Sequence, residues 1–203
     1  MEQLPSNAFE RYDNEPDGLF YQMPRFVTHI DDRAIAAVTQ LYREHFPRGG
    51  DILDLMSSWV SHLPPEVEYG RVVGLGMNEE ELAANPRLTE YLVHNLNREP
   101  TLPFGDASFD GAAICVSIQY LTQPVQVLAE VKRVLRPGAR LIVTFSNRCF
   151  PTKAVAVWQM LDDMGHVPLV EGYLRQAGFA RITTTEHRPR RRGSDPLFGV
   201  IGS

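Results

Sequence analysis

The run LPFGDASFDGAAICVSIQYLTQPVQVLAEVKRVLRPGARLIVTFSN, from Leu102 to Asn147, decides the fold. Gly111–Ile118 is a continuous apolar stretch, which is typical of a strand buried on both faces. Apolar side chains then recur at helical spacing from Pro124 to Leu135, and Pro137-Gly138 is expected to stop that helix. Arg140–Phe145 is a second apolar strand. A strand, a helix and a strand in this order predict two parallel strands joined by a crossover helix.

Strands and helices alternate along the rest of the chain as well. We predict strands at Asp51–Leu55, Arg71–Leu75 and Tyr91–Leu96. Two helices are expected to start at capping residues, one at Asp31-Asp32 and one at Asn78, where the acids that follow lie in the first turn. Two more helices are expected to cover about Pro151–Met164 and Val170–Ala177. The segment after Gly178 is expected to form two strands joined by a long polar turn, with the last strand antiparallel. The pattern predicts an α/β protein with a doubly wound, mostly parallel seven-stranded sheet.

The composition is that of one globular domain. The 203 residues are 43% hydrophobic and 22% charged, and the net charge of -5 gives no sign of a nucleic-acid binder. No apolar run reaches the roughly 20 residues that a membrane span needs, and the polar N-terminus lacks the marks of a signal peptide. We therefore expect a cytoplasmic protein in which Cys115 and Cys149 stay reduced and no metal is bound. Residues 1–30 are predicted to be a mobile lid, and residues 31–203 the domain itself.

One edge of the sheet is the expected binding site. In open parallel sheets, ligands bind at the carboxyl ends of the strands, beside the point where the strand order reverses. Four segments that follow predicted strands should therefore surround one crevice. They are Asp54 to Trp59, Gly76 to Asn78, Asn95 to Asn97, and Ser117 to Tyr120.

Two motifs in the opening run resemble a known family. Leu102-Pro103-Phe104, Asp106 and Ser108-Phe109-Asp110 precede the fourth strand, and Arg133 to Gly138 precede the fifth. In order and spacing they are similar to the LPF-x-D-x-SFD and RVL-[KR]-PG segments of a group of class I S-adenosylmethionine-dependent methyltransferases. The likeness covers about residues 50–203. It implies the methyltransferase-like Rossmann fold and S-adenosylmethionine as the cofactor.

The crevice departs from the family pattern. The family's Asp-x-Gly-x-Gly-x-Gly turn keeps its acid, Asp54, but its glycines are replaced by Met56, Ser58 and Val60. The family's ribose-binding acid, which closes the second strand, corresponds to Gly76. Loss of this charged contact is expected to weaken cofactor binding by about one to two decades. We therefore expect Gly76→Asp to tighten it.

Other polar residues are expected to replace the missing contacts. Asn95 or Asn97 stands near the place of the family's adenine-binding acid, and an amide oxygen is a good acceptor. Asn78 or Glu79 is expected to reach the ribose. The predicted cofactor-binding residues are Asp54, Met56, Ser57, Ser58, Gly76, Met77, Asn78, Asn95, Leu96, Asn97 and Ser117.

The resemblance implies that the methyl acceptor enters over the fourth strand, beneath an N-terminal lid. His29 or Tyr120 is the candidate base for a nitrogen or oxygen acceptor, although alignment with an activated sulfonium can suffice without a base. The alternative is that Phe26 and His29 only staple and cap the following helix. The predicted substrate-binding residues are Tyr21, Arg25, Phe26, Gln119 and Arg148.

These observations favour an S-adenosylmethionine-dependent methyltransferase that acts on a small molecule. The altered crevice supports an alternative, a catalytically silent methyltransferase-like protein with a binding or regulatory role. Non-methyl chemistry on the same fold is a third possibility. The charged run Arg188–Arg192 is interpreted as an exposed turn. The acceptor, its reacting atom and the oligomeric state stay open.

Overall fold

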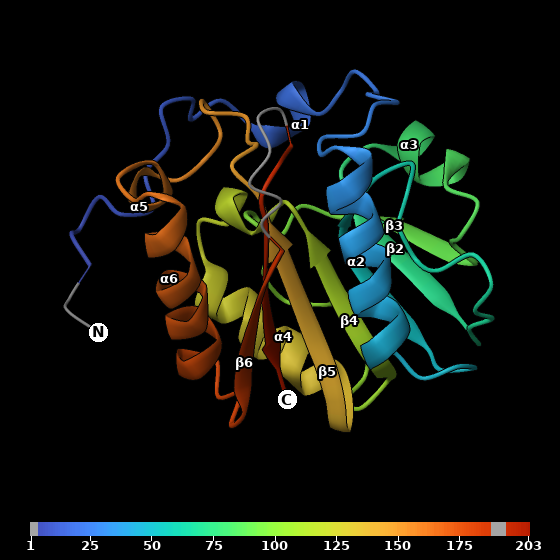
Figure 1. Ribbon diagram of the computed structural model, residues 1–203. Coiled ribbons are helices and arrows are strands. Elements are labelled where there is room, and N and C mark those ends of the chain that lie inside the picture. Colours follow the sequence, from blue (N-terminus) through green and yellow to red (C-terminus); the bar gives the residue numbers. More distant parts are fainter. Residues whose placement is uncertain (1–3, 188–193) are drawn as a thin grey trace.

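The computed structural model describes residues 4–187 and 194–203. The run Arg188–Arg192 lies outside these residues. Seven strands form a single sheet (Figure 1). Their bounds are β1 (Ile52–Ser57), β2 (Val72–Gly76), β3 (Glu90–Val93), β4 (Phe109–Cys115), β5 (Leu135–Phe145), β6 (Ile182–His187) and β7 (Leu197–Gly202).

The strand order is β3-β2-β1-β4-β5-β7-β6. β1 pairs in parallel with both β2 and β4, and β7 runs antiparallel to both β5 and β6. The chain therefore starts in the middle of the sheet, builds one side, returns to β1 and builds the other. This confirms the predicted doubly wound, mostly parallel α/β sheet with an antiparallel C-terminal strand.

Helices cover both faces of the sheet (Figure 1). They are α1 (Asp17–Phe20), α2 (Asp32–His45), α3 (Glu79–Ala84), α4 (Pro124–Val134), α5 (Ala156–Gln159) and α6 (Asp163–Gln176), with a 3-10 turn η1 (Ile118–Tyr120). Two of the predicted caps are confirmed. The side chain of Asp31 accepts from the backbone N–H groups of Arg33 and Ala34, and that of Asn78 from Glu81 N–H.

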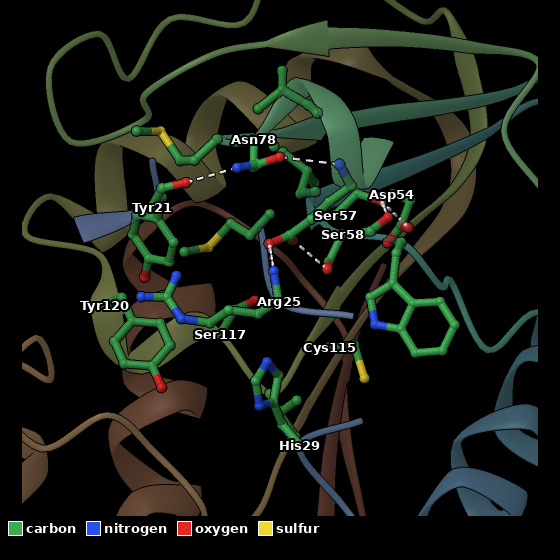
Figure 2. Close-up of a pocket in the computed structure, with 18 of the residues that line it drawn as sticks. Tyr21, Arg25, His29, Asp54, Ser57, Ser58, Asn78, Cys115, Ser117 and Tyr120 are labelled. Atoms are coloured by element: carbon green, nitrogen blue, oxygen red, sulfur yellow. Dashed lines mark hydrogen bonds between the residues drawn. The ribbon is translucent and has the colours of Figure 1, made fainter. Parts of the chain in front are cut away.

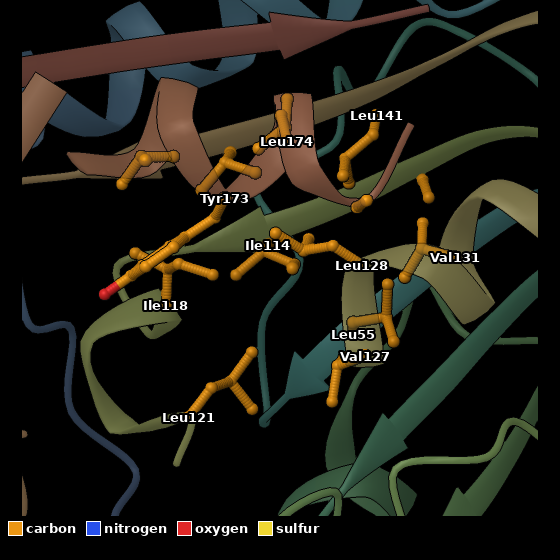
Figure 3. Packing of buried hydrophobic residues seen from close by; sticks show 14 of the residues in the cluster. Leu55, Ile114, Ile118, Leu121, Val127, Leu128, Val131, Leu141, Tyr173 and Leu174 are labelled. Carbon is orange, nitrogen blue, oxygen red and sulfur yellow. The ribbon is translucent and has the colours of Figure 1, made fainter. Parts of the chain in front are cut away.

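The core has two parts because successive strand residues face opposite sides of the sheet. Leu53 and Leu55 of β1 pack on the α4 and α6 side, and Ile52 packs on the α2 side. Figure 3 shows the first part, where Leu55 and Ile114 meet Leu128 of α4. Each fully buried aliphatic side chain of this kind contributes about 1.5–3 kcal/mol. These contacts fix the strand ends that carry the site.

Arg133, in the motif before β5, ties the two motif segments together. Its guanidinium donates to the backbone carbonyls of Leu102 and Phe104 and forms ion pairs with Asp106 and Glu130 at 2.8 and 2.7 Å. These contacts fix the loop that leads into β4. The motifs that carry the family resemblance therefore act here as scaffold.

Several predicted boundaries are wrong. Pro137-Gly138 does not stop α4, which ends at Val134 and passes directly into β5. The predicted helix at 151–164 is reduced to Ala156–Gln159, while α6 begins at Asp163, seven residues before the predicted Val170. The shortening has a tertiary cause. The N–H groups of Ala156 and Val157 donate to the carbonyls of Glu10 and Ala8, and Val155 forms a β-bridge with Arg11, so the backbone before α5 pairs with the N-terminal segment and the helix begins only at Ala156.

The N-terminal segment is anchored to the rest of the protein at a few buried residues. Ala8 is 1% exposed and Asp17 6%. Lys153, which is fully buried, holds the segment through Asp13 at 3.1 Å and Asp17 at 3.5 Å. From here residues 16–31, which we call the strap, cross the carboxyl ends of the strands to reach α2 (Figure 1).

Candidate functional site

A pocket of about 310 Å³ opens at the carboxyl edge of the sheet, where β1, β2 and β4 end side by side under the strap (Figure 2). Its volume is within the range of about 300–1,000 Å³ usual for small-ligand sites. Most of the predicted site residues line it: Tyr21, Arg25, His29, Asp54, Met56, Ser57, Ser58, Gly76, Met77, Asn78, Asn95, Leu96, Asn97, Ser117, Tyr120 and Arg148. Phe26 and Gln119 do not.

Residues 56–61, which form the end of β1 and the turn that follows it, contain no glycine and begin with a left-handed backbone; we call them the turn after β1. Met56 has a φ of 53°, and the register between β1 and β2 shifts between Leu55 and Ser57. This conformation costs a non-glycine residue about 1–2 kcal/mol. The hydroxyls of Ser57 and Ser61 both donate to Oδ2 of Asp54, at 2.6 and 2.7 Å. Serine hydroxyls therefore stabilise a turn that lacks the family's glycines.

Asp54 is a buried carboxyl group at the floor of the pocket. Burial raises its pKa to about 6, although the hydrogen bonds from Ser57 and Ser61 lower it. An ionised carboxylate at such a place is costly unless a cation lies near it. Asp54 is therefore suited to a positively charged ligand group.

Gly76 cannot carry the family's ribose-binding acid. A Cβ on Gly76 would overlap the backbone oxygen of Ser57 and press on Leu82. The turn after β1 occupies this space because it approaches β2 closely. The expectation that Gly76→Asp would tighten cofactor binding is therefore wrong, since the side chain has no room.

Glu81 supplies a carboxylate at this end of the pocket instead. It lies in the first turn of α3 and is 9% exposed. Its Oε1 accepts from the backbone N–H of Arg25 at 2.7 Å, and its Oε2 accepts from Ser58 Oγ at 2.6 Å. Glu81 thus joins the strap to the turn after β1. Glu79, one candidate for the ribose contact, is exposed and does not line the pocket.

Asn78 also holds the strap. Its Nδ2 donates to the carbonyls of Tyr21 and Gln22 at 2.9 and 3.1 Å, and its Oδ1 caps α3 at Glu81 N–H (Figure 2). The amide is therefore already engaged at both ends. The strap crosses the ends of β1 and β2, so it covers the predicted cofactor side of the pocket as well as the acceptor side.

The two asparagines after β3 also hold protein groups. Nδ2 of Asn97 donates to Asp17 and to the carbonyl of Tyr120, and its Oδ1 accepts from the N–H and hydroxyl of Thr122. Oδ1 of Asn95 accepts from the N–H groups of Asn97 and Arg98. The amide oxygen of Asn97 thus has two donors without any ligand.

The end of β4 is strained and leaves a polar group without a partner. Val116 has a φ of 43°, which is rare for a β-branched residue. Ser117 Oγ is buried in the pocket wall with no hydrogen-bond partner among the described residues. Gln119 is 1% exposed and donates to Val116 O, so it supports this turn from behind the pocket. A buried group of this kind calls for a ligand or water.

Phe150, which follows β5, organises the predicted acceptor side. The ring of His29 lies 5.2 Å and that of Tyr120 5.9 Å from it, centroid to centroid. The guanidinium carbon of Arg25 is 5.5 Å from the same centroid. The hydroxyl of Tyr120 accepts from the N–H of Phe150 at 2.8 Å, which links η1 to the loop after β5.

The two candidate bases differ in their proton affinity. Burial raises the pKa of Tyr120 to about 12, so its phenol stays protonated near neutral pH. Loss of hydration, with a smaller contribution from Arg25, lowers the pKa of His29, although the charge of Glu81 opposes this. A neutral imidazole can accept a proton. His29 is therefore better suited than Tyr120 to act as a base.

The remaining predicted contacts lie at the rim. Arg148 is exposed and pairs with Asp195 at 2.7 Å. Phe26 is 50% exposed and packs edge-on against Trp59, whose Nε1–H donates to Val27 O at 3.1 Å. Trp59 thus points toward the strap rather than filling the hollow beyond Asp54.

Sequence reasoning missed Glu81 and Phe150. Glu81 was interpreted only as one acid of the first turn of a helix, and only its burial sets it apart from Glu79 and Glu80. Phe150 stood in a segment predicted to be a loop before a helix. No pattern in the sequence marks either one, because the strap that brings them into the site comes from a distant part of the chain.

Two kinds of site are absent from the part of the chain that the structure describes. Residues 4–187 and 194–203 contain no group of three or more His, Cys, Asp or Glu side chains placed to hold a metal ion. No helix in those residues is both long and apolar enough to cross a membrane.

Comparisons with known proteins agree with this architecture. Residues 57–143 match the family model described as a methyltransferase domain. An O-methyltransferase, cnsE of Penicillium expansum, is 38% identical over 106 residues, which cover 50% of this chain and 38% of that protein. A demethylmenaquinone methyltransferase of Lactiplantibacillus plantarum is 31% identical over 125 residues, covering 57% and 53%. The chain thus spans about half or less of these relatives.

The solved structures extend the likeness to most of the chain. A SAM-dependent methyltransferase from Aquifex aeolicus aligns with a TM-score of 0.59 at 18% identity, over 92% of this chain and 96% of that one. At this identity the likeness concerns the fold.

The groups in the pocket fit S-adenosylmethionine, the cofactor that the sequence resemblance implies. Asp54 offers a carboxyl group to a cationic centre, Glu81 offers a carboxylate at the end of β2, and Ser117 Oγ lacks a partner. The chain thus has the class I methyltransferase fold, and its residues 57–143 match the methyltransferase domain model.

Proposed function

We propose that this protein is an S-adenosylmethionine-dependent methyltransferase that acts on a hydroxyl group of a small molecule. The observation that carries the proposal is the pocket itself. It joins a buried carboxyl group, Asp54, to an aromatic chamber around Phe150, with the imidazole of His29, an exposed residue, at the edge of the chamber. When bound, S-adenosylmethionine supplies an activated methyl group. The O-methyltransferase names of several relatives support oxygen as the acceptor atom.

The two sides of the pocket have different tasks in this proposal. Asp54 and Glu81 hold the cationic and hydroxylated parts of the cofactor, and Ser117 lies between them and the acceptor. Phe150, Tyr120 and the strap exclude water from the chamber, which strengthens the electrostatic interactions inside it. His29 accepts the proton of the acceptor hydroxyl. Alignment and desolvation account for most of the expected rate gain.

Calorimetric titration with S-adenosylmethionine and S-adenosylhomocysteine tests the proposal. We expect both to bind in the micromolar range. Asp54→Ala should weaken the binding of S-adenosylmethionine more than that of S-adenosylhomocysteine, because only S-adenosylmethionine carries the positively charged sulfonium. Absence of binding at millimolar concentration would refute the proposal.

A catalytically silent binding protein is the second candidate. The observation at Gly76 favours this candidate. Gly76 stands where the family has its ribose-binding acid, and there is no space at this position for any side chain. This candidate predicts that the chain forms a stable complex in a pull-down and that S-adenosylhomocysteine does not change its thermal melting. Saturable binding of the cofactor would exclude it.

A further inference from the structure

Arg25 spans the pocket from one end to the other. Its backbone N–H is fixed at the β2 end by Glu81, at 2.7 Å. Its guanidinium lies at the β4–β5 end, with its carbon 4.6 Å from the ring centroid of Phe20 and 5.5 Å from that of Phe150. Figure 2 shows the side chain pointing toward Tyr120 and Tyr21. The main chain of Arg25 thus faces the cofactor side, and its charge faces the acceptor side.

The charge of Arg25 has no anionic partner among the described residues. The other two arginines that line the pocket are neutralised, since Arg11 pairs with Asp17 at 2.6 Å and Arg148 with Asp195 at 2.7 Å. Within residues 4–187 and 194–203, the guanidinium of Arg25 donates only to two backbone carbonyls, those of Phe20 at 2.8 Å and Met23 at 3.4 Å. Some of its five N–H donors are left for a ligand.

The rings around this cation define the shape of its ligand. Phe20 lies edge-on to Phe150, with 5.3 Å between centroids, and the ring of Tyr120 is tilted against Phe150 at 5.9 Å. Aromatic walls favour a flat apolar body, while a guanidinium favours a carboxylate, which it can bind through two parallel hydrogen bonds. His29 touches the same ring of Phe150.

We propose that the acceptor is a small planar hydroxy acid whose carboxylate binds Arg25 and whose hydroxyl faces His29. This inference rests on the proposed function. In the transfer, the acceptor oxygen forms a bond to the methyl carbon while the methyl–sulfur bond breaks and the sulfur keeps that electron pair. The hydroxyl proton passes to the imidazole of His29. Arg25 is then the residue that selects acids over neutral analogues.

Matched acids and esters test this assignment. The probes are 2-hydroxybenzoate, 4-hydroxybenzoate and 3,4-dihydroxybenzoate, each beside its methyl ester, titrated into protein saturated with S-adenosylhomocysteine. We expect at least one acid to bind about ten- to a hundred-fold more tightly than its ester, as is usual for a charge-assisted pair. If acids and esters bind alike, or if none binds, the assignment is overturned.

Variants of Arg25 test whether this residue causes the preference for acids over their methyl esters. Arg25→Gln keeps a donor for the carbonyl of Phe20 but removes the charge, so the acid should lose its advantage over the ester, and Arg25→Lys should keep part of it. Arg175→Gln, on the outer face of α6, should change nothing. Unchanged fluorescence of Trp59 in Arg25→Gln would show that the strap is still in place. An acid preference that survives Arg25→Gln would overturn the assignment.

The cofactor's own carboxylate is the competing partner for Arg25. S-Adenosylhomocysteine carries that carboxylate, and 5′-methylthioadenosine lacks it. Suppose that Arg25→Gln weakens the binding of S-adenosylhomocysteine about ten-fold or more and leaves the binding of 5′-methylthioadenosine unchanged. Arg25 then binds the cofactor, and the inference fails while the proposed function stands. Failure of the wild-type protein to bind S-adenosylhomocysteine would instead refute the proposed function.

Discussion

The unit β4–α4–β5 and the edge formed by β1, β2 and the strap meet at the same pocket, but different forces hold them. The first is packed by apolar side chains such as Ile114, Leu128 and Val143, all fully buried. The second is held by buried polar contacts, among them the hydrogen bonds of Asp54 and Glu81. Apolar packing is non-directional and tolerant, whereas buried polar groups are costly when one partner is lost.

The two sides of the pocket therefore differ in rigidity. One side is rigid, and the other keeps its shape only while its polar contacts are intact. The acceptor end of the sheet is fixed by the core. The cofactor end depends on a strap whose contacts reach across 32 to 57 residues of sequence. Substitutions at the edge formed by β1, β2 and the strap should therefore change three properties together: the pH dependence of the unfolding free energy, the attachment of the strap and the affinity for the cofactor.

The largest expected effect is at Gly76. Gly76→Asp places a Cβ into the backbone oxygen of Ser57 and an unpaired carboxylate at a buried position. Overpacking and a buried unpaired charge together should cost about 4 kcal/mol or more of unfolding free energy. Urea denaturation measures the loss. Gly138→Asp is the control, because Gly138 has a positive φ but a Cβ there would meet open space. Tighter cofactor binding by a fully stable Gly76→Asp variant would contradict the steric argument.

The next effect concerns the charge of Asp54. Its pKa is raised from 3.8 to about 6 by burial, so the folded protein binds this proton more tightly than the unfolded chain does. The resulting stabilisation is fully present below about pH 4 and is lost as the pH rises through about 6. The difference between the two pKa values corresponds to about 3 kcal/mol.

Asp54→Asn removes this titration while keeping an oxygen for the two serines. The unfolding free energy of the wild type, measured relative to that of Asp54→Asn, should therefore fall by up to about 3 kcal/mol between pH 4 and pH 7. Urea unfolding at several pH values measures it. Parallel pH profiles for the two proteins would mean that Asp54 is not a costly buried anion.

Glu81→Gln tests how the strap is fastened. The amide keeps one acceptor for Arg25 N–H but loses the charge, so we expect a loss of about 1–3 kcal/mol and faster hydrogen exchange in residues 21–28. Glu79→Gln is the matched control, because Glu79 lies in the same first turn and is exposed. If both variants exchange at the same rate, Glu81 does not fasten the strap.

The smallest effect is expected at Trp59. Trp59→Phe keeps an aromatic ring beside Phe26 but loses the hydrogen bond to Val27 O. One such bond contributes about 0.5–1.5 kcal/mol. Limited proteolysis in the strap should become a few-fold faster, with little change in global stability. A larger loss of global stability would show that the strap and the core unfold together.

Prediction from the sequence worked best where local patterns repeat. The α/β order, the antiparallel last strand and the caps by Asp31 and Asn78 follow from apolar spacing and capping chemistry. It was wrong at 151–164, where the backbone pairs with residues 8–11. It was also wrong at Gly76, where the closeness of the turn after β1 decides what fits.

The amino-acid sequence by itself determined the sheet, its crossover helices and the edge at which the pocket opens, because these depend on periodic burial along continuous segments. Only the tertiary structure decided which polar groups meet there. Glu81, Phe150 and Arg25 come from three distant segments, and each lies at the pocket because the strap crosses the sheet. Contacts between such segments leave no periodic signal in the chain, since their partners are set by three-dimensional packing and not by local spacing.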